Sequence, residues 1–205
     1  MSQSERTYTI LEINFKLKYK SFIKTGLQYP AFNYLISNLS IFNFQSKFMK
    51  YARLTKEQFE ELHPEFINFL ATQSIDKTEW DKIKADKPEI AEQELDIFSD
   101  LIWEGVLSRT EYLEHFSETH VFLFQAFETE IHSIVIKSAV TGIDLLSQTG
   151  LLWLSEHMFT EDIEMKVGTK KFSEERNLSI FQLIQQGAYL SDGQFYKQIR
   201  LVMES

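Results

Sequence analysis

The sequence predicts an α+β fold, mainly α-helical, in a single domain with a small antiparallel sheet in the middle of the chain. Residues 55–116 repeat apolar side chains at three-to-four spacing, which is the period of a helix. Residues 119–146 are instead dense in β-branched and aromatic side chains, which favour strands. The chain has 205 residues and is 43% hydrophobic, as expected for a globular domain.

The first helices are marked by local start signals. Thr55 and Gln58 form a capping box, so a helix should begin between them. Pro64 interrupts the apolar pattern and predicts a kink or a new helix. Asp76 and Glu79 form the next start signal.

A longer helix should begin at Pro88 and run past Trp103. It has an apolar stripe on one side and acidic side chains on the wet faces, where we also place Asp100. The segment SRTEYLEHF, residues 108–116, looks like a continuation or a fourth helix. The predicted apolar stripe is Ile90, Leu95, Phe98, Ile102 and Val106.

The sheet should contain HVFLFQAF (120–127) and EIHSIVIK (130–137). In the second segment Ile134 and Ile136 alternate with polar or smaller side chains, so they should face the core. AVTG, residues 139–142, is a plausible turn, and IEMKVG, residues 163–168, can return as another strand.

Three further helices are expected in the C-terminal part. Ser147 caps the first, and Ser173 starts the second, which Gly187 ends. Ser191 and Gln194 form a capping box for the last helix, whose inner face should be Phe195, Ile199 and Val202.

Residues 1–48 differ in charge from the rest of the chain. They hold six Lys and Arg against two Glu, whereas residues 49–205 hold 15 Lys and Arg against 28 Asp and Glu, or −13. We expect 1–48 to be a poorly ordered basic and aromatic segment and 49–205 to be a single globular acidic domain. A secretory targeting segment is disfavoured, because Lys or Asn interrupts each short apolar run of residues 1–48. An arm for an anionic partner or a lipid surface and a mis-assigned start before Met49 remain open as interpretations.

Composition excludes several function classes. The absence of cysteine removes disulfides, thiolate catalysis, thiolate metal sites and iron–sulfur clusters. Apolar runs are too short for a membrane span. We expect no nucleic-acid binding by the 49–205 domain, because its charge of −13 repels phosphate. Neither a phosphate-binding loop nor a nucleophile motif is present, so no cofactor is predicted.

The order of several segments, among them KYARLTKEQF, EFINFLATQSIDKTEW, HSIVIK and LIQQGAYLSDGQFYKQI, resembles a family of small bacterial proteins known only as a domain of unknown function. The resemblance covers about residues 49–205. It implies a bacterial, cytoplasmic protein and supplies no catalytic residues.

The weak catalytic candidates are Glu111, His115 and Glu118. Glu111 and His115 are four residues apart and would share one face of a helix. A catalytic zinc helix would carry two histidines at this spacing with Glu between them, and that signature is absent. We therefore predict no metal site, and a solvated surface pair is the favoured interpretation.

Thr169, Lys170 and Lys171 precede the helix expected from Ser173. An anion could bind there, although an ordinary solvated basic turn is favoured. Taken together, the sequence predicts a cytoplasmic, non-enzymatic interaction or adaptor protein with an acidic helical surface, whose partner is another protein or a second copy. The alternative is an enzyme with an unrecognised site of histidine and carboxylate side chains, with or without a metal.

Overall fold

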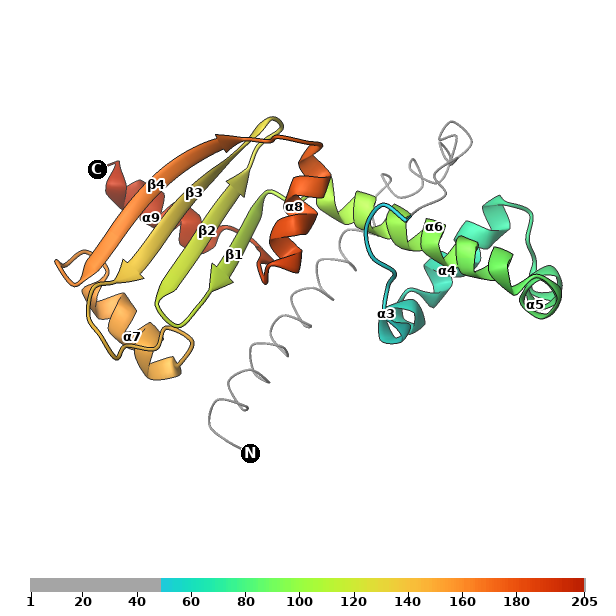
Figure 1. Ribbon diagram of the computed structural model, residues 1–205, viewed down its shortest axis with the longest axis horizontal. Coiled ribbons are helices and arrows are strands. Elements are labelled where there is room, and N and C mark those ends of the chain that lie inside the picture. The colour runs from blue at the N-terminus through green and yellow to red at the C-terminus, as the bar shows by residue number, and fades with distance from the viewer. Residues whose placement is uncertain (1–48, 205) are drawn as a thin grey trace. The chain divides into compact units, whose positions relative to one another are not determined.

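A computed structural model describes residues 49–204 of the chain (Figure 1). The described residues divide into two compact units, which we call the helical unit (49–108) and the sheet unit (109–204). The predictions for residues 1–48 lie outside the described residues. Helices and five antiparallel strands together confirm the predicted α+β, mainly helical class.

The helical unit contains four helices whose ends follow the predicted local signals. The helices are α3 (Lys56–Glu61), α4 (His63–Thr72), α5 (Lys77–Asp86) and α6 (Pro88–Leu107). Thr55 closes the predicted capping box with Gln58, and the Asp76 carboxylate accepts the Glu79 amide hydrogen. Pro64 lies in the first turn of α4, which confirms a new helix there.

Aromatic side chains form the core of the helical unit. Phe69 and Phe98 are fully buried, with ring centroids 5.4 Å apart. Phe66 packs between them and the ring of Trp80, edge to face with Phe98 at 5.1 Å and with Trp80 at 5.4 Å. Edge-to-face packing of this kind stabilises a core beyond the apolar area that it buries. The rings therefore join α4, α5 and α6.

The sheet unit is a five-stranded antiparallel sheet with three helices. Its strands are β1 (Tyr112–Phe116), β2 (His120–Ala126), β3 (Glu130–Ser138), β4 (Ile163–Lys171) and β5 (Tyr189–Ser191), in the spatial order β4-β3-β2-β1-β5. Its helices are α7 (Gln148–His157), α8 (Arg176–Gln185) and α9 (Gln194–Met203). The last strand thus returns to pair with the first.

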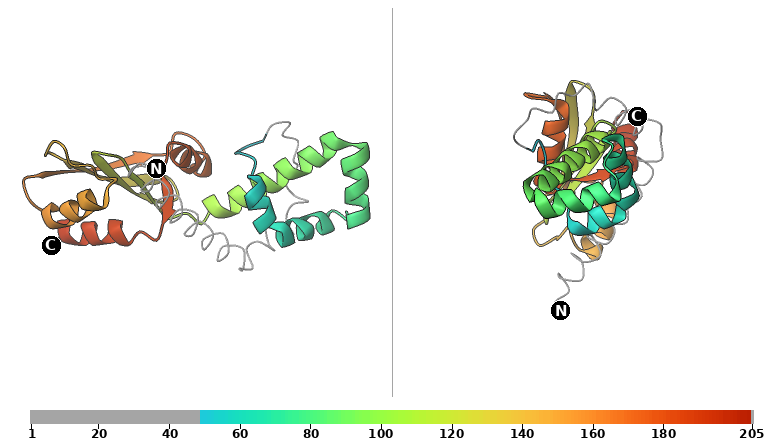
Figure 2. Two further views of the ribbon diagram at one scale, coloured as in Figure 1. Left: turned by 90° about the horizontal axis from the view of Figure 1, so that it is seen from below. Right: turned by 90° about the vertical axis from the view of Figure 1, so that its right-hand side faces the viewer.

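The two faces of the sheet differ. On one face, four fully buried strand side chains pack against Leu154 of α7, Met158 directly after α7, and Tyr196 and Ile199 of α9. Figure 2 shows these helices together on one side of the sheet and α8 on the other. The four core side chains of the strands are Val121, Leu123, Ile134 and Ile136, so the predicted alternation of β3 is confirmed.

On the second face, α8 runs along β1. At its start, the Arg176 guanidinium donates hydrogen bonds to the carbonyls of Thr110 and Phe127 at 2.5 and 2.7 Å. Just beyond its end, Gly187 lies against the His115 ring. Gly187 has a φ of +101°, the left-handed conformation that ends many helices, so its predicted role as a helix stop is confirmed.

Several local predictions are wrong for physical reasons. Residues 112–116 form strand β1 rather than a helix, because pairing with β2 and β5 on both sides overrides the local pattern. Ser173 does not start α8, since β4 continues to Lys171 and the N-cap is Glu175 without a side-chain hydrogen bond. Ser191 lies in β5, and the N-cap of α9 is Gly193.

Two burial predictions are also wrong. Asp100 is 4% exposed rather than on a wet face, because its carboxylate accepts backbone hydrogen bonds from residues 50 and 51. Val202 is 47% exposed, and Tyr196 takes the inner position on α9 with Ile199.

Candidate functional site

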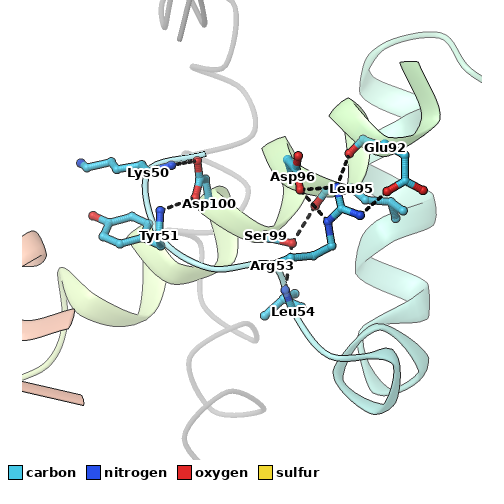
Figure 3. A network of polar contacts seen from close by, with 9 residues as sticks. All are labelled: Lys50, Tyr51, Arg53, Leu54, Glu92, Leu95, Asp96, Ser99 and Asp100. Carbon is cyan, nitrogen blue, oxygen red and sulfur yellow. Dashed lines mark hydrogen bonds and ion pairs between the residues drawn. The ribbon is translucent and has the colours of Figure 1, made fainter. Parts of the chain in front are cut away.

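One polar cluster binds residues 50–54 to side chains of α6 (Figure 3). The two oxygens of Asp100 accept the amide hydrogens of Lys50 and Tyr51 at 2.7 and 2.9 Å. The Ser99 hydroxyl accepts the Leu54 amide hydrogen at 3.2 Å and donates to the Leu95 carbonyl at 2.7 Å. These contacts hold residues 50–54, which we call the strap, against α6.

Ion pairs extend this cluster at the solvent-exposed end. The Arg53 guanidinium contacts both Asp96 and Glu92. Burial is the main cause that raises the pKa of Asp100, although the two backbone N–H groups act in the opposite direction. A shifted carboxyl of this kind can mark a reactive site, but here both oxygens are bonded to backbone donors. The cluster therefore has a structural role.

The three catalytic candidates from the sequence do not share a helix face. His115 lies on β1, Glu111 immediately precedes that strand, and Glu118 lies in the turn that follows it. A strand rises by about 3.3 Å per residue, so Glu111 and His115 are separated by roughly 13 Å along it. Glu111 and Glu118 are both exposed, at opposite ends of β1. The structure thus leaves these two carboxylates on either side of His115.

His115 has an unusual environment. Its Nδ1 is buried and has no hydrogen-bond partner among the described residues. Its ring lies 5.6 Å from that of Phe122, and a Cβ atom on Gly187 would approach the ring to 3.0 Å. Within residues 49–204, no three His, Asp or Glu side chains are placed to hold a metal ion. His115 is therefore placed as a packing residue beside an aromatic row.

That aromatic row belongs to the face of the sheet that carries α8. Side chains two residues apart on a strand share a face, and the strand register then assigns neighbours across the sheet. Among the described residues of the sheet unit, α8 is the helix on this face, and it covers one end (Figures 1 and 2). We call the remainder the open face: His115, His120, Phe122, Phe124, Ser133, Val135, Lys137, Glu164, Lys166, Gly168 and Lys170.

The type of side chain on the open face changes from one strand to the next. One row runs across it from Lys166 through Val135 and Phe122 to His115. The next begins at Gly168, opposite Ser133 and Phe124. Aromatic rings thus occupy the central strand β2. Ser133, Val135 and Lys137 occupy β3, and the edge strand β4 carries Lys166 and Lys170 together with Glu164.

A hollow of about 330 Å³ opens on this face beside α8. Its floor includes Phe124, Ile131 and Ser133, and polar side chains of α8 such as Gln182 form one wall. The connection from β4 to α8 closes one end with Lys171, Phe172, Ser173 and Glu174. This size lies at the lower end of the range for small-molecule sites, and an apolar floor with polar walls is typical of them.

The lysines of the sheet unit gather at this edge. Four of the five in residues 109–204 lie on β3 or β4: Lys137, Lys166, Lys170 and Lys171. Lys137 approaches Glu164 at 4.0 Å. Among the described residues, no carboxylate forms an ion pair with Lys166 or Lys170, which are exposed. The open face therefore carries three lysines, Lys137, Lys166 and Lys170, against one carboxylate, Glu164, in a chain that is acidic as a whole.

This arrangement suits a ligand with an anionic group and a flat apolar group. Sequence reasoning identified Lys170 and Lys171 as a basic turn, and the structure places both on the wall of the hollow. It missed Phe122, Phe124 and Lys166 as site residues. The alternation in HVFLFQAF and IEMKVG was the available signal, but it does not say which face of a sheet stays uncovered.

Comparison with known proteins locates the chain in one family. In the described part of the chain, no helix is long and apolar enough to cross a membrane. No curated protein and no solved structure matches the chain. Residues 49–204 match the model of the family of unknown function DUF6495, and the chain therefore belongs to that family.

Proposed function

We propose that this protein is a non-enzymatic interaction protein that binds an anionic partner on the open face of its sheet. The observation that carries the proposal is the pair Lys166 and Lys170, exposed and without an ion pair among the described residues, beside a hollow with an apolar floor. In the proposal the protein acts in a bacterial cytoplasm, as the sequence resemblance implies.

The helical unit supports a binding role less strongly. The charges on α5 neutralise one another locally, because Lys82 contacts Glu79 and Lys84 contacts Asp81. Exposed pairs of this type contribute little to stability and leave a mixed surface. We therefore place the partner on the sheet unit rather than on the acidic helical surface expected from the sequence.

The enzyme alternative requires Glu111, His115 and Glu118 to converge on one substrate. Strand geometry separates the two carboxylates along β1, and acid–base catalysis needs its groups within hydrogen-bond reach of the same reacting atoms. The open face therefore supports binding better than it supports catalysis.

The test uses pyrophosphate as a simple anionic probe of the full chain. Titration followed by amide NMR at low salt should give saturable shifts confined to β3, β4 and the start of α8. The variant Lys166→Glu/Lys170→Glu should abolish them. Raising the salt from about 50 to about 300 mM should weaken binding, because surface charges are screened over a shorter distance.

A matched control separates the site from net charge. Lys77→Glu/Lys87→Glu changes the total charge by the same amount on exposed positions of the helical unit. It should leave the pyrophosphate shifts in place. An equal loss in both variants, or the lack of saturable shifts in the unmodified chain, would rule the proposal out.

A further inference from the structure

The aromatic side chains of the open face form a row along β2. The rings of Phe122 and Phe124 have centroids 6.5 Å apart and planes only 8° from parallel. His120 continues the row, with its ring 5.7 Å from that of Phe122 and 15° from parallel. All three side chains are half-buried rather than covered. The row therefore offers several flat surfaces in succession.

Two lysines of β4 lie beside the aromatic row, on the same face of that strand as Glu164. Lys166 and Lys170 lie four residues apart on one face of the strand. β3 separates the two rows, so they are about 10 Å apart, twice the spacing between neighbouring strands. The positive charges thus follow the same direction as the rings.

The strip between these two rows is lined by small residues. Ser133 and Gly168 lie opposite each other there, and a Cβ atom on Gly168 would come within 3.3 Å of the Ser133 hydroxyl oxygen. Beside the strip, Gln182 and Gln186 of α8 line the hollow with groups that donate and accept hydrogen bonds. A chain molecule can therefore lie along the strip with polar contacts on the α8 side.

We infer that the anionic partner is a single-stranded nucleic acid, with bases stacked on the row of Phe122 and Phe124 and phosphates beside Lys166 and Lys170. This inference rests on the proposed function and names its partner. Single-strand binding combines a cationic track with aromatic platforms, because every base has a flat face. A duplex hides those faces, and a free nucleotide would use only one ring and one lysine.

The net charge of the domain argued against nucleic acid, but that argument concerns the average over residues 49–205. The field near a surface depends on the charges closest to it, especially within about one Debye length. The surrounding carboxylates should make binding weak at physiological salt and strongly dependent on salt concentration.

The first experiment measures fluorescence anisotropy of a labelled 12-nucleotide single strand of mixed sequence with the full chain at low salt. The variant Phe122→Leu/Phe124→Leu keeps apolar side chains at both positions but removes the rings, and it should weaken strand binding about tenfold or more. The control Phe159→Leu removes an exposed ring outside the open face and should bind like the unmodified chain.

A second measurement does not depend on the folding of any variant. Titration of the unmodified chain with the same unlabelled strand should shift the amides of both Phe122 and Phe124, as well as those of Lys166 and Lys170. Shifts confined to the lysines would overturn the inference.

The remaining outcomes separate this inference from the proposed function. If pyrophosphate binds but the strand binds equally well to Phe122→Leu/Phe124→Leu, the inference fails and the proposed function stands. It also fails if the duplex, adenosine monophosphate or a poly-glutamate peptide competes as well as the single strand. If neither pyrophosphate nor the strand binds, both fail.

Discussion

The carboxylate of Asp100 holds the backbone of Tyr51 on α6: its Oδ1 accepts the Tyr51 amide hydrogen at 2.9 Å, and its Oδ2 accepts that of Lys50 at 2.7 Å. Asp100 is 4% exposed and Tyr51 is 8% exposed. A single side chain thus satisfies two donors of the strap, which forms no regular secondary structure itself.

Asp100→Ala should lower the free energy of unfolding of the helical unit by about 2–3 kcal/mol, because it leaves two backbone donors without their charged acceptor. The measurement is urea unfolding followed by tryptophan fluorescence in a Trp153→Phe background, which leaves Trp80 and Trp103 as reporters of this unit. Asp96→Ala is the control: it removes a half-exposed ion pair with Arg53 and should cost less than about 1 kcal/mol. Equal losses in the two variants would contradict the assigned role.

The same carboxyl should make the stability of the helical unit depend on pH. Burial raises the pKa of Asp100 in the folded state above its ordinary value of 3.8. At pH values between the ordinary pKa and the folded-state pKa, the folded state binds more protons than the unfolded state. The contribution of Asp100 to the unfolding free energy therefore falls as pH rises. The cost of the buried charge is fully present above the folded-state pKa.

Asp100→Asn cannot titrate and should lack this dependence. We subtract the unfolding free energy of the variant from that of the unmodified chain. This difference should fall as pH rises from about 4 to about 7. The same urea experiment, repeated at several pH values, measures it. A difference that widens with pH would mean that the pKa is lowered instead.

Gly193 should tolerate alanine much less well than Gly142. Both have positive φ values, +72° and +86°, so each pays a backbone cost on substitution. A Cβ atom on Gly193 would also lie 2.3 Å from the Tyr112 ring, whereas nothing lies within 4 Å of one on Gly142. Gly142→Ala should cost about 1 kcal/mol and Gly193→Ala at least about 3 kcal/mol. Amide hydrogen exchange of the sheet measures both, and equal costs would show that the Tyr112 ring moves aside freely.

Arg176→Lys should loosen the start of α8. The guanidinium reaches the carbonyls of Thr110 and Phe127 together, which one ammonium group at the end of a flexible stem cannot reproduce. We expect a loss of about 1–2 kcal/mol, read as faster hydrogen exchange in α8 and in the β2–β3 turn. Arg200→Lys, at the exposed pair with Glu204, should change stability by less than about 0.5 kcal/mol.

The helices up to Leu107 could be predicted because their signals are local. Thr55, Asp76 and the prolines act within one turn of the helix they start, so no distant contact is needed to identify them. The alternation of Ile134 and Ile136 is local in the same sense. Strand β1 was missed because the spacing of Glu111 and His115 imitates a helix, while the pairing that makes it a strand involves β5.

The candidate site could be predicted only in part. The basic residues Lys170 and Lys171 are adjacent in sequence, and an anion was one interpretation of them, although a solvated basic turn was favoured. Phe122 and Phe124 carried the pattern of a half-buried strand, but their partial exposure depends on α8, which covers one end of this face and leaves part of β2 open. Helix placement over a sheet is set by long-range packing, which periodicity does not encode.

The pairing of β5 with β1 also determines when the sheet is completed during synthesis. Tyr112 pairs with Ser191, 79 positions later, whereas β2 and β3 follow β1 within one hairpin each. At about 5–20 residues per second, the outer edge of β1 waits roughly 4–16 seconds for its partner. Glu114 places a carboxylate on β1 during that interval, and such inward-pointing charges discourage pairing with other chains. When β5 arrives, the Tyr189 hydroxyl donates to that carboxylate at 3.3 Å, so the group that protects the nascent edge becomes buried in the finished sheet.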